Sequence, residues 1–186
     1  MELYDDRPAD DGVIGRSLAE LGFALPNGYV DFLRKHNGLE GFIGDKYITL
    51  WKAKELIPFN REYEVDKYAP GILLFGSSGG GEGYGFDTQA AEMPIVRVPF
   101  IGMDRRHSKV VARGFAGLFA TFVECSGNGN VGDRSLPKGM ELFEITPVLL
   151  GGDPSDPKNK IWLTRQQHFE AVRFWNGVVD DLCRQA

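Results

Sequence analysis

The sequence predicts one domain that combines helices with strands and closes with a long helix. Its 186 residues fit the usual size of a single domain. No internal repeat and no long polar linker divides the chain. Short apolar runs typical of strands stand between segments whose apolar residues recur at helical spacing. The clearest helical segment is the last, where one face carries residues at alternating steps of four and three: His168, Val172, Trp175, Val179 and Leu182.

Composition and charge indicate a globular protein without a membrane-spanning segment. Hydrophobic residues make up 42% and charged residues 25% of the chain, and the net charge is −5. Proteins that bind nucleic acids or anionic membranes usually carry a concentrated positive surface charge. This chain is acidic, so we expect it to bind neither of them directly. Glycine is frequent at 24 residues, which predicts many tight turns.

The cysteines and the N-terminal residues indicate a cytoplasmic protein. Cys125 and Cys183 are too few for a disulfide framework and have no metal-binding spacing. The first residues contain neither a positive segment nor an apolar run, so they do not resemble a secretory signal. Four aspartates, with Pro8 and Gly12, favour a mobile acidic lead-in over residues 1–12.

The first half of the chain predicts two helices followed by most of a sheet. A short helix over 13–21 stops at Gly22. A second helix begins near Pro26, buries an aromatic and aliphatic stripe, and ends at Asn37-Gly38. The elements expected next are a strand over 46–51, a helix over 53–68 interrupted near Pro58, and strands over 72–75, 84–87 and 94–100.

The second half predicts a buried helix, several loops and the closing helix. Apolar residues recur densely over 110–123, which favours a buried helix. A polar loop over 126–139, an apolar run over 143–150 and a turn-rich segment follow. Thr164 and Gln167 fit a capping box that opens the last helix. We expect Trp175, in the middle of the helical stripe, to be buried.

Two glycine patterns imitate catalytic or cofactor motifs. Residues 76–80 read G-x-S-x-G with Ser78 as the candidate nucleophile, but a nucleophile elbow needs a helix after the serine, and a turn and a strand are expected here. A hydrolase using Ser78, with His107 or His168 as its base, is the alternative from a different functional class. Residues 127–132 read G-x-G-x-x-G, but they do not open a helix.

Metal and phosphate patterns are incomplete. The glycines at 79–81 lack the lysine and the helix of a phosphate-binding loop. A calcium-like pattern that begins at Glu124 has Ser135 where the last acidic ligand is needed. The chain also has no HExxH and no paired CxxC. We therefore expect no catalytic residue, no bound metal and no cofactor.

The segment over 79–87, GGGEGYGFD, is the strongest candidate for a binding surface. Gly79, Gly80, Gly81 and Gly83 are expected to form a turn that another backbone can approach closely, either from the same fold or from a partner. Nearby acidic and aromatic side chains supply charge and anchors for a partner. The residues expected around one groove beside this turn are Trp51, Asn60, Tyr63, Glu82, Tyr84 and Asp87. The alternative is a tight hairpin whose polar side chains bond their own turn.

Several segments occur in an order that is typical of one protein family. They are Leu25-Pro26, Tyr29, Phe32-Leu33 and Asn37-Gly38, then Ile48 to Trp51, Asn60 with Tyr63, Phe75 to Asp87, Pro94 to Pro99, and the aromatic helix from Phe115 to Phe122. Over about residues 15–123, the chain resembles the SUKH superfamily, the Smi/Knr-like proteins. It departs at Gly114, where the family commonly has a serine. Residues 124–186 resemble an extension found in a subset of these proteins.

The resemblance implies a single α+β domain over 13–186, with its core at 15–123 and a largely antiparallel central sheet flanked by helices. It also implies function by protein binding, without a shared catalytic mechanism. Bacterial members resemble immunity proteins that neutralise polymorphic toxins, and a basic nuclease-type toxin would suit the acidic charge of this chain. A regulatory interaction scaffold is the alternative within the binding class.

Overall fold

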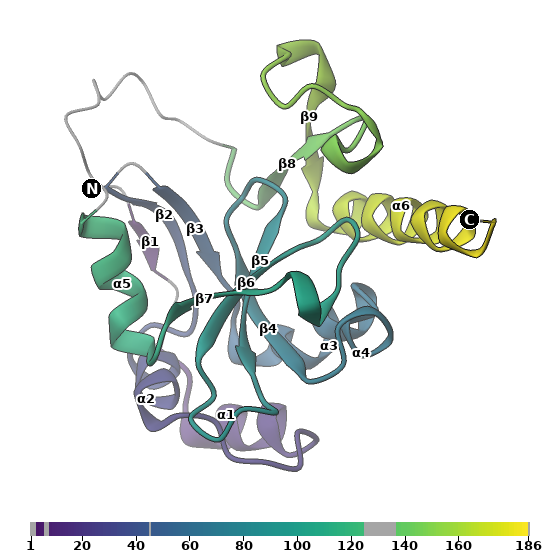
Figure 1. Cartoon of the computed structure of the whole chain (residues 1–186). Coiled ribbons are helices and arrows are strands. Elements are labelled where there is room, and N and C mark those ends of the chain that lie inside the picture. Colours follow the sequence, from purple (N-terminus) through teal and green to yellow (C-terminus); the bar gives the residue numbers. More distant parts are fainter. Residues whose placement is uncertain (1–2, 6–7, 45, 125–136, 186) are drawn as a thin grey trace.

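The computed structural model describes residues 3–5, 8–44, 46–124 and 137–185, and it confirms the predicted α+β fold (Figure 1). A seven-stranded sheet forms its centre, and all neighbouring strands in this sheet are antiparallel. The strands lie side by side in the order of the chain, so each connection is local. They are β1 (Leu3–Asp5), β2 (Leu39–Ile43), β3 (Lys46–Leu50), β4 (Ile72–Ser77), β5 (Glu82–Asp87), β6 (Ile95–Pro99) and β7 (Lys109–Ala112).

Helices in the connections pack against this sheet, and local chemistry sets their ends. They are α1 (Asp11–Leu18), α2 (Asn27–Lys35), α3 (Leu56–Glu62), α4 (Val65–Tyr68) and α5 (Phe115–Glu124), with short 3-10 turns η1 (Ala53–Glu55) and η2 (Arg105–His107). Asp10 accepts a hydrogen bond from Val13 N and caps α1. Asn37 and Gly38 both have positive φ, which ends α2, and the Asn37 side chain accepts a hydrogen bond from Ala53 N.

The C-terminal residues form a hairpin and a long helix beside the sheet (Figure 1). In chain order these elements are β8 (Met140–Glu144), η3 (Val148–Leu150), η4 (Pro157–Asn159), β9 (Lys160–Thr164) and α6 (Arg165–Gln185). Strands β8 and β9 are antiparallel partners. The predicted capping box is confirmed, because Thr164 N donates to Gln167 Oε1 at 3.0 Å and Gln167 N donates back to Thr164 Oγ1 at 3.3 Å.

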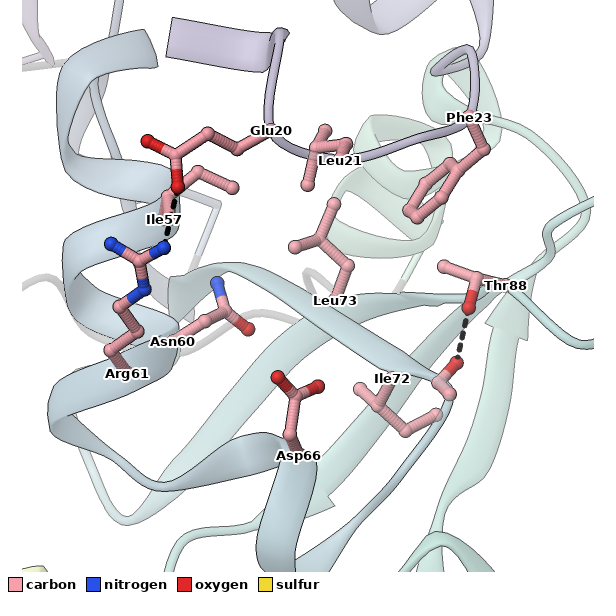
Figure 2. Close-up of a pocket in the computed structure, with 11 residues that line it drawn as sticks. Glu20, Leu21, Phe23, Ile57, Asn60, Arg61, Asp66, Ile72, Leu73 and Thr88 are labelled. Carbon is pink, nitrogen blue, oxygen red and sulfur yellow. Dashed lines mark hydrogen bonds and ion pairs between the residues drawn. The ribbon is translucent and has the colours of Figure 1, made fainter.

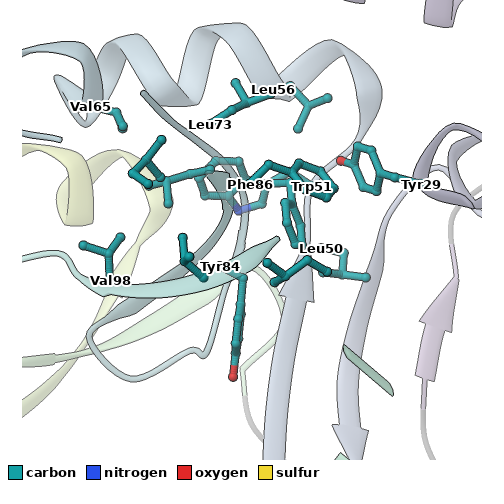
Figure 3. Close-up of a cluster of buried hydrophobic side chains, with 14 of the residues drawn as sticks. Tyr29, Leu50, Trp51, Leu56, Val65, Leu73, Tyr84, Phe86 and Val98 are labelled. Carbon is teal, nitrogen blue, oxygen red and sulfur yellow. The ribbon is translucent and has the colours of Figure 1, made fainter. Parts of the chain in front are cut away.

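A cluster of buried rings and aliphatic side chains fills the space between the sheet and the helices (Figure 3). The Tyr29 ring of α2 is fully buried, and its centroid lies 5.3 Å from those of Phe75 and Phe86 and 5.0 Å from that of Phe115. These rings come from two helices and two strands. Burying each large apolar side chain contributes roughly 1.5–3 kcal/mol, so this cluster is a main source of the stability of the sheet–helix layers.

Two predicted helices are wrong in kind or in position. Residues 110–123 do not form one helix. The β-branched Val110 lies in strand β7, where it pairs with Val96 of β6, and helix α5 begins only at Phe115. The preceding helical segment breaks at Glu64, whose φ is 53°, and not near Pro58. Pro58 lies in the first turn of α3, where a backbone N–H has no helical partner to lose.

Strands β1, β2, β8 and β9 were not predicted as strands. Residues 3–5 of the expected lead-in pair with β2, and Asp10 from the same segment caps α1. The expectation for Trp175 is also wrong, since this residue is only partly buried. The buried face of α6 runs through His168, Val172 and Asn176 instead. Toward its C-terminal end, α6 extends away from the sheet (Figure 1).

Candidate functional site

Three of the six residues expected around a groove lie in the core. Trp51 is 1% exposed, Tyr63 is 0% exposed and Tyr84 is 4% exposed. The Trp51 and Tyr63 rings stack with centroids 5.9 Å apart, and Tyr63 stacks in turn on Phe100 at 4.5 Å. Figure 3 draws Trp51 among the side chains of the buried cluster. The expectation that these three rings line a groove is therefore wrong. They stabilise the core, because large apolar rings gain most from burial.

The two expected acids, Glu82 and Asp87, are the first and last residues of β5 and lie at opposite ends of it. They are five residues apart, so the alternation of a strand places them on opposite faces. The Arg97 Nε lies 3.2 Å from Glu82 Oε1, and Arg105 Nη2 donates to Asp87 Oδ2 at 2.7 Å. Both carboxylates are thus engaged within the chain, and their contribution to partner binding stays a prediction.

Another part of the same chain approaches the glycine turn. Leu142 N in β8 donates a hydrogen bond to Gly79 O at 3.1 Å. Gly79 and Gly81 have φ of 68° and 95°, and with Gly80 they form the bend between β4 and β5. Gly83 lies inside β5, so its assignment to the turn is corrected. Of the two interpretations of these glycines, this geometry favours close approach within the fold.

A buried polar network joins β8 to the sheet beneath this turn. Glu141 is fully buried, and Ser77 Oγ donates to its Oε1 at 2.8 Å and lies 3.0 Å from its Oε2. Arg165, the first residue of α6, forms an ion pair with the same carboxylate. Burial raises the pKa of Glu141, and Arg165 and Ser77 oppose this shift because they stabilise the charged form.

A second buried pair extends this network into α6. The Tyr63 hydroxyl lies 2.7 Å from His168 Nδ1. Burial, aided by the charge of Arg165, lowers the pKa of His168 to about 3, so its ring is neutral near pH 7. The rings of Phe100 and Phe143 surround the imidazole at centroid distances of 5.1 and 5.6 Å. The network thus fastens the C-terminal segment to the sheet.

A pocket of about 220 Å³ opens between the segment after α1, the helices α3 and α4, and the start of β4 (Figure 2). Its apolar lining residues are Leu21, Phe23, Ile57, Ile72 and Leu73. Its other lining residues are Glu20, Asn60, Arg61, Asp66, Gly71 and Thr88. Of the six residues expected around a groove, Asn60 is the one that lines this pocket.

Asn60 gives the pocket a fixed wall. Its Nδ2 donates to Leu56 O and to Leu74 O, both at 2.7 Å, and its Oδ1 accepts from Leu74 N at 2.8 Å. These bonds tie α3 to β4. Both amide N–H groups are used inside the fold, so Asn60 shapes the pocket and does not offer a donor to a ligand.

Two of the three charged side chains around the pocket form an ion pair with each other, and the third is not part of this pair. Arg61 Nη2 donates to Glu20 Oε2 at 2.5 Å across one side of it. Figure 2 shows the carboxylate of Asp66 directed toward the interior, below Leu73. Among the residues that the structure describes, no hydrogen bond or ion pair engages this carboxylate. Two carboxylates and one guanidinium therefore leave the pocket with a net negative charge.

A second pocket, of about 280 Å³, lies beside β2 and β3 near the start of α6. Its acids are already used by the fold. Glu40 Oε1 accepts from Tyr47 Oη at 2.5 Å and from Gly139 N at 2.8 Å. Glu55 Oε2 accepts from Lys52 N at 3.0 Å and caps η1. We therefore take the first pocket as the candidate site.

The candidate nucleophile Ser78 does not have the strand–turn–helix surroundings that a nucleophile elbow requires. Ser78 lies between two antiparallel strands, where its N donates to Glu82 O at 2.9 Å and its Oγ accepts from Gly80 N at 3.3 Å. The patterns at 127–132 and Ser135 lie outside the described residues. Within the described ranges, no three His, Cys, Asp or Glu side chains gather as a metal site. No helix in those ranges is long and apolar enough to cross a membrane.

Sequence reasoning missed the buried Glu141 and the pocket acid Asp66. A signal for Glu141 exists, because it shares an inward-facing position with Phe143 in the alternating segment over 140–144. An acid at such a position indicates a buried partner. Asp66 gives no comparable signal, since an aspartate in the first turn of a helix is common on any surface.

Comparison with known families places most of this framework in one group. Residues 8–121, more than half of the chain, match the sequence model of the SMI1 / KNR4 family (SUKH-1). The match extends from before α1 into α5 and includes every residue that lines the candidate pocket. The strands β8 and β9 and the helix α6 lie outside it. Curated proteins provide no significant match.

Proposed function

Because the chain belongs to the SMI1 / KNR4 (SUKH-1) family, we propose that it acts by binding another protein and not by catalysis. More specifically, it is an immunity protein that neutralises a polymorphic toxin in the cytoplasm. Family membership is the observation that carries this proposal. Fold alone does not assign a function, so the candidate site must be compatible with it.

The candidate site supports a binding role. It is an open pocket with an apolar floor and an unpaired carboxylate, which is the kind of surface that accepts an anchoring side chain of a partner. Its volume of about 220 Å³ is below the roughly 300–1,000 Å³ that is usual for small-molecule sites. The two residues that imitate a hydrolase, Ser78 and His168, are engaged in separate internal contacts.

The charge of the chain favours a basic toxin domain, such as a nuclease. A net charge of −5 attracts a positively charged partner over distances of about a Debye length, which accelerates association. We therefore expect the association rate with the toxin to fall as salt is added, while the dissociation rate changes less.

The experiment is co-expression with the toxin domain encoded beside the gene. We expect this protein to restore growth, and the two purified proteins to elute together at equal stoichiometry. A toxin that stays lethal and elutes alone would contradict the immunity role. If the neighbouring genes encode no toxic domain, and the protein is recovered with a cellular regulator instead, the regulatory scaffold is the better description.

A further inference from the structure

We propose that the candidate pocket receives one basic side chain, a lysine or an arginine, from the partner protein. This inference rests on the proposed function and names the chemistry of the partner at this site. The pocket combines an apolar floor with a carboxylate directed inward, and both features are visible in Figure 2. Lysine and arginine are the side chains that bury an aliphatic stem and carry a positive end.

The floor of the pocket is suited to the stem. Leu73 lies at the centre of the floor and is 7% exposed, and Leu21 packs against the core. Phe23 keeps 39% of its surface exposed, so part of its ring is available to a partner. An aliphatic chain laid across these groups removes apolar surface from water on both sides.

The unpaired carboxylate is suited to the charged end. Asp66 has no partner among the described residues, so it can accept hydrogen bonds from an ammonium or from two N–H groups of a guanidinium. Arg61, the cation of the pocket, is already held by Glu20 at 2.5 Å. The site therefore offers one free negative charge and no free positive charge.

Other occupants fit less well. A partner carboxylate would meet the net negative charge of the pocket. A purely apolar side chain would fill the floor but cover Asp66 without pairing it, and covering an unpaired charge is costly. A basic side chain is the occupant that satisfies the floor and the acid together.

The test uses the full chain, labelled with ¹⁵N, and two small probes of matched size. Nα-acetyl-arginine amide carries the guanidinium, and Nα-acetyl-norleucine amide carries only the stem. We expect the arginine probe to shift the backbone amide signals of the pocket residues Leu21, Phe23, Asp66, Leu73 and Thr88. The norleucine probe should bind more weakly. Equal shifts from both probes, or no shift from either, would overturn the proposal.

Asp66→Asn isolates the charge. Because Asp66 is exposed in the free protein, we expect this variant to bind the arginine probe about two- to fivefold more weakly. The affinity for the norleucine probe should be the same in Asp66→Asn and in the parent. The control is Glu144→Gln, which removes an acid from β8 that lines neither described pocket. Arginine binding that is the same in Asp66→Asn and in the parent would overturn the proposal.

The toxin complex separates this inference from the proposed function. If both hold, Asp66→Asn weakens capture of the toxin domain by about tenfold or more, because the partner then covers the pocket. If the parent captures the toxin and Asp66→Asn does so equally well, the function stands and the basic-side-chain inference fails. If the arginine probe binds but no toxin is captured, the pocket chemistry stands and the immunity role fails.

Discussion

Ser77 and Glu141 are 64 residues apart in the chain and share a buried hydrogen bond of 2.8 Å. Ser77 is the last residue of β4, inside the family-matched region, and Glu141 belongs to the C-terminal hairpin outside it. Arg165 closes the same contact from the start of α6. This contact fixes the C-terminal segment to the family-matched part of the chain, next to the glycine turn.

We predict that Glu141→Ala lowers the free energy of unfolding by about 3–5 kcal/mol, because it leaves the partly buried Arg165 without its partner. Ser77→Ala should cost about 1–3 kcal/mol, since it removes one donor from a carboxylate that keeps its arginine. Urea unfolding at neutral pH measures both. Glu144→Gln, on the same strand, should change stability by less than about 0.5 kcal/mol. Equal, small effects at Glu141 and Glu144 would show that the C-terminal segment is not held by this network.

The neutral, buried His168 predicts a stability that falls in acid. Its pKa is about 3 in the folded protein and about 6.5 in an unfolded chain, so the unfolded state binds the extra proton as pH falls through this window. The stability of the folded state therefore decreases below about pH 6.5, by up to about 1.4 kcal/mol per pH unit, until pH 3. Above pH 6.5 this contribution is constant.

The comparison with His168→Asn isolates this effect, because asparagine is neutral and keeps a hydrogen-bonding group near Tyr63. Chemical unfolding between pH 7 and pH 4 should show a shallower decline for this variant than for the parent. His107→Asn, which makes the same change of residue type at an exposed histidine, is the matched control. Raised pKa values such as that of Glu141 act in the opposite direction, so the difference between variants is the quantity to compare. Parallel curves for the parent and His168→Asn would contradict the prediction.

The sequence predicted the kind of fold better than the location of its site. Helical spacing and capping residues identified α2 and α6, because those signals are local. The strand β1 was missed, since a three-residue strand that pairs only at a sheet edge has almost no local signal. Residues 110–123 were misassigned because a dense apolar run does not distinguish a strand from a helix.

The site was predicted from side-chain chemistry without knowledge of burial. Trp51 and Tyr63 were expected at a surface because aromatic rings anchor partners, but the same rings also build cores, and only the tertiary structure decides between the two roles. Asn60 lines a pocket, but not the groove that was expected beside the glycine turn, and its amide serves the fold. Asp66 and Phe23 come together only through folding, so no sequence pattern connects them.

Two glycines of the predicted motif should differ in how much stability they lose on substitution by alanine. A Cβ on Gly76 would lie 2.4 Å from Thr49 O, a backbone atom of the neighbouring strand, so Gly76→Ala must displace the strand pairing. We expect a loss of at least about 1–3 kcal/mol. A Cβ on Gly80 meets no described atom within 4 Å, and Gly80→Ala should be nearly neutral. Thermal unfolding of both variants measures this contrast. A stable Gly76→Ala variant would mean that β3 and β4 are not paired as described.

A serine-reactive probe distinguishes the binding role from the hydrolase alternative. We predict that a fluorophosphonate does not label Ser78, because the turn between β4 and β5 supplies no helix N-terminus behind it and its Oγ accepts a bond from Gly80 N. Mass spectrometry after incubation with the probe measures labelling, and a known serine hydrolase is the positive control. Labelling of the parent that disappears in Ser78→Ala would establish a reactive serine and overturn the non-enzymatic proposal.

Charge reversal at the two ends of β5 should separate a structural acid from a solvent-facing one. The Asp87 side chain is 13% exposed and accepts hydrogen bonds from Arg105 and from Gln89 N. Asp87→Lys would place a second positive charge beside Arg105, and we expect it to cost about 2–4 kcal/mol. The Glu82 side chain is 37% exposed and makes one ion contact, so Glu82→Lys should cost less than about 1 kcal/mol.

Melting temperatures of the two single variants measure this difference, and toxin capture by folded Glu82→Lys then tests its role in binding. If Glu82→Lys folds normally and loses the toxin, this end of β5 belongs to the binding surface together with the pocket. If it folds and still binds, Glu82 serves only the fold, and the interface lies on the side of the molecule that carries Asp66. If Glu82→Lys unfolds the protein and Asp87→Lys does not, the prediction is contradicted. Glu82 would then be the acid that the fold requires, although its side chain is more exposed than that of Asp87.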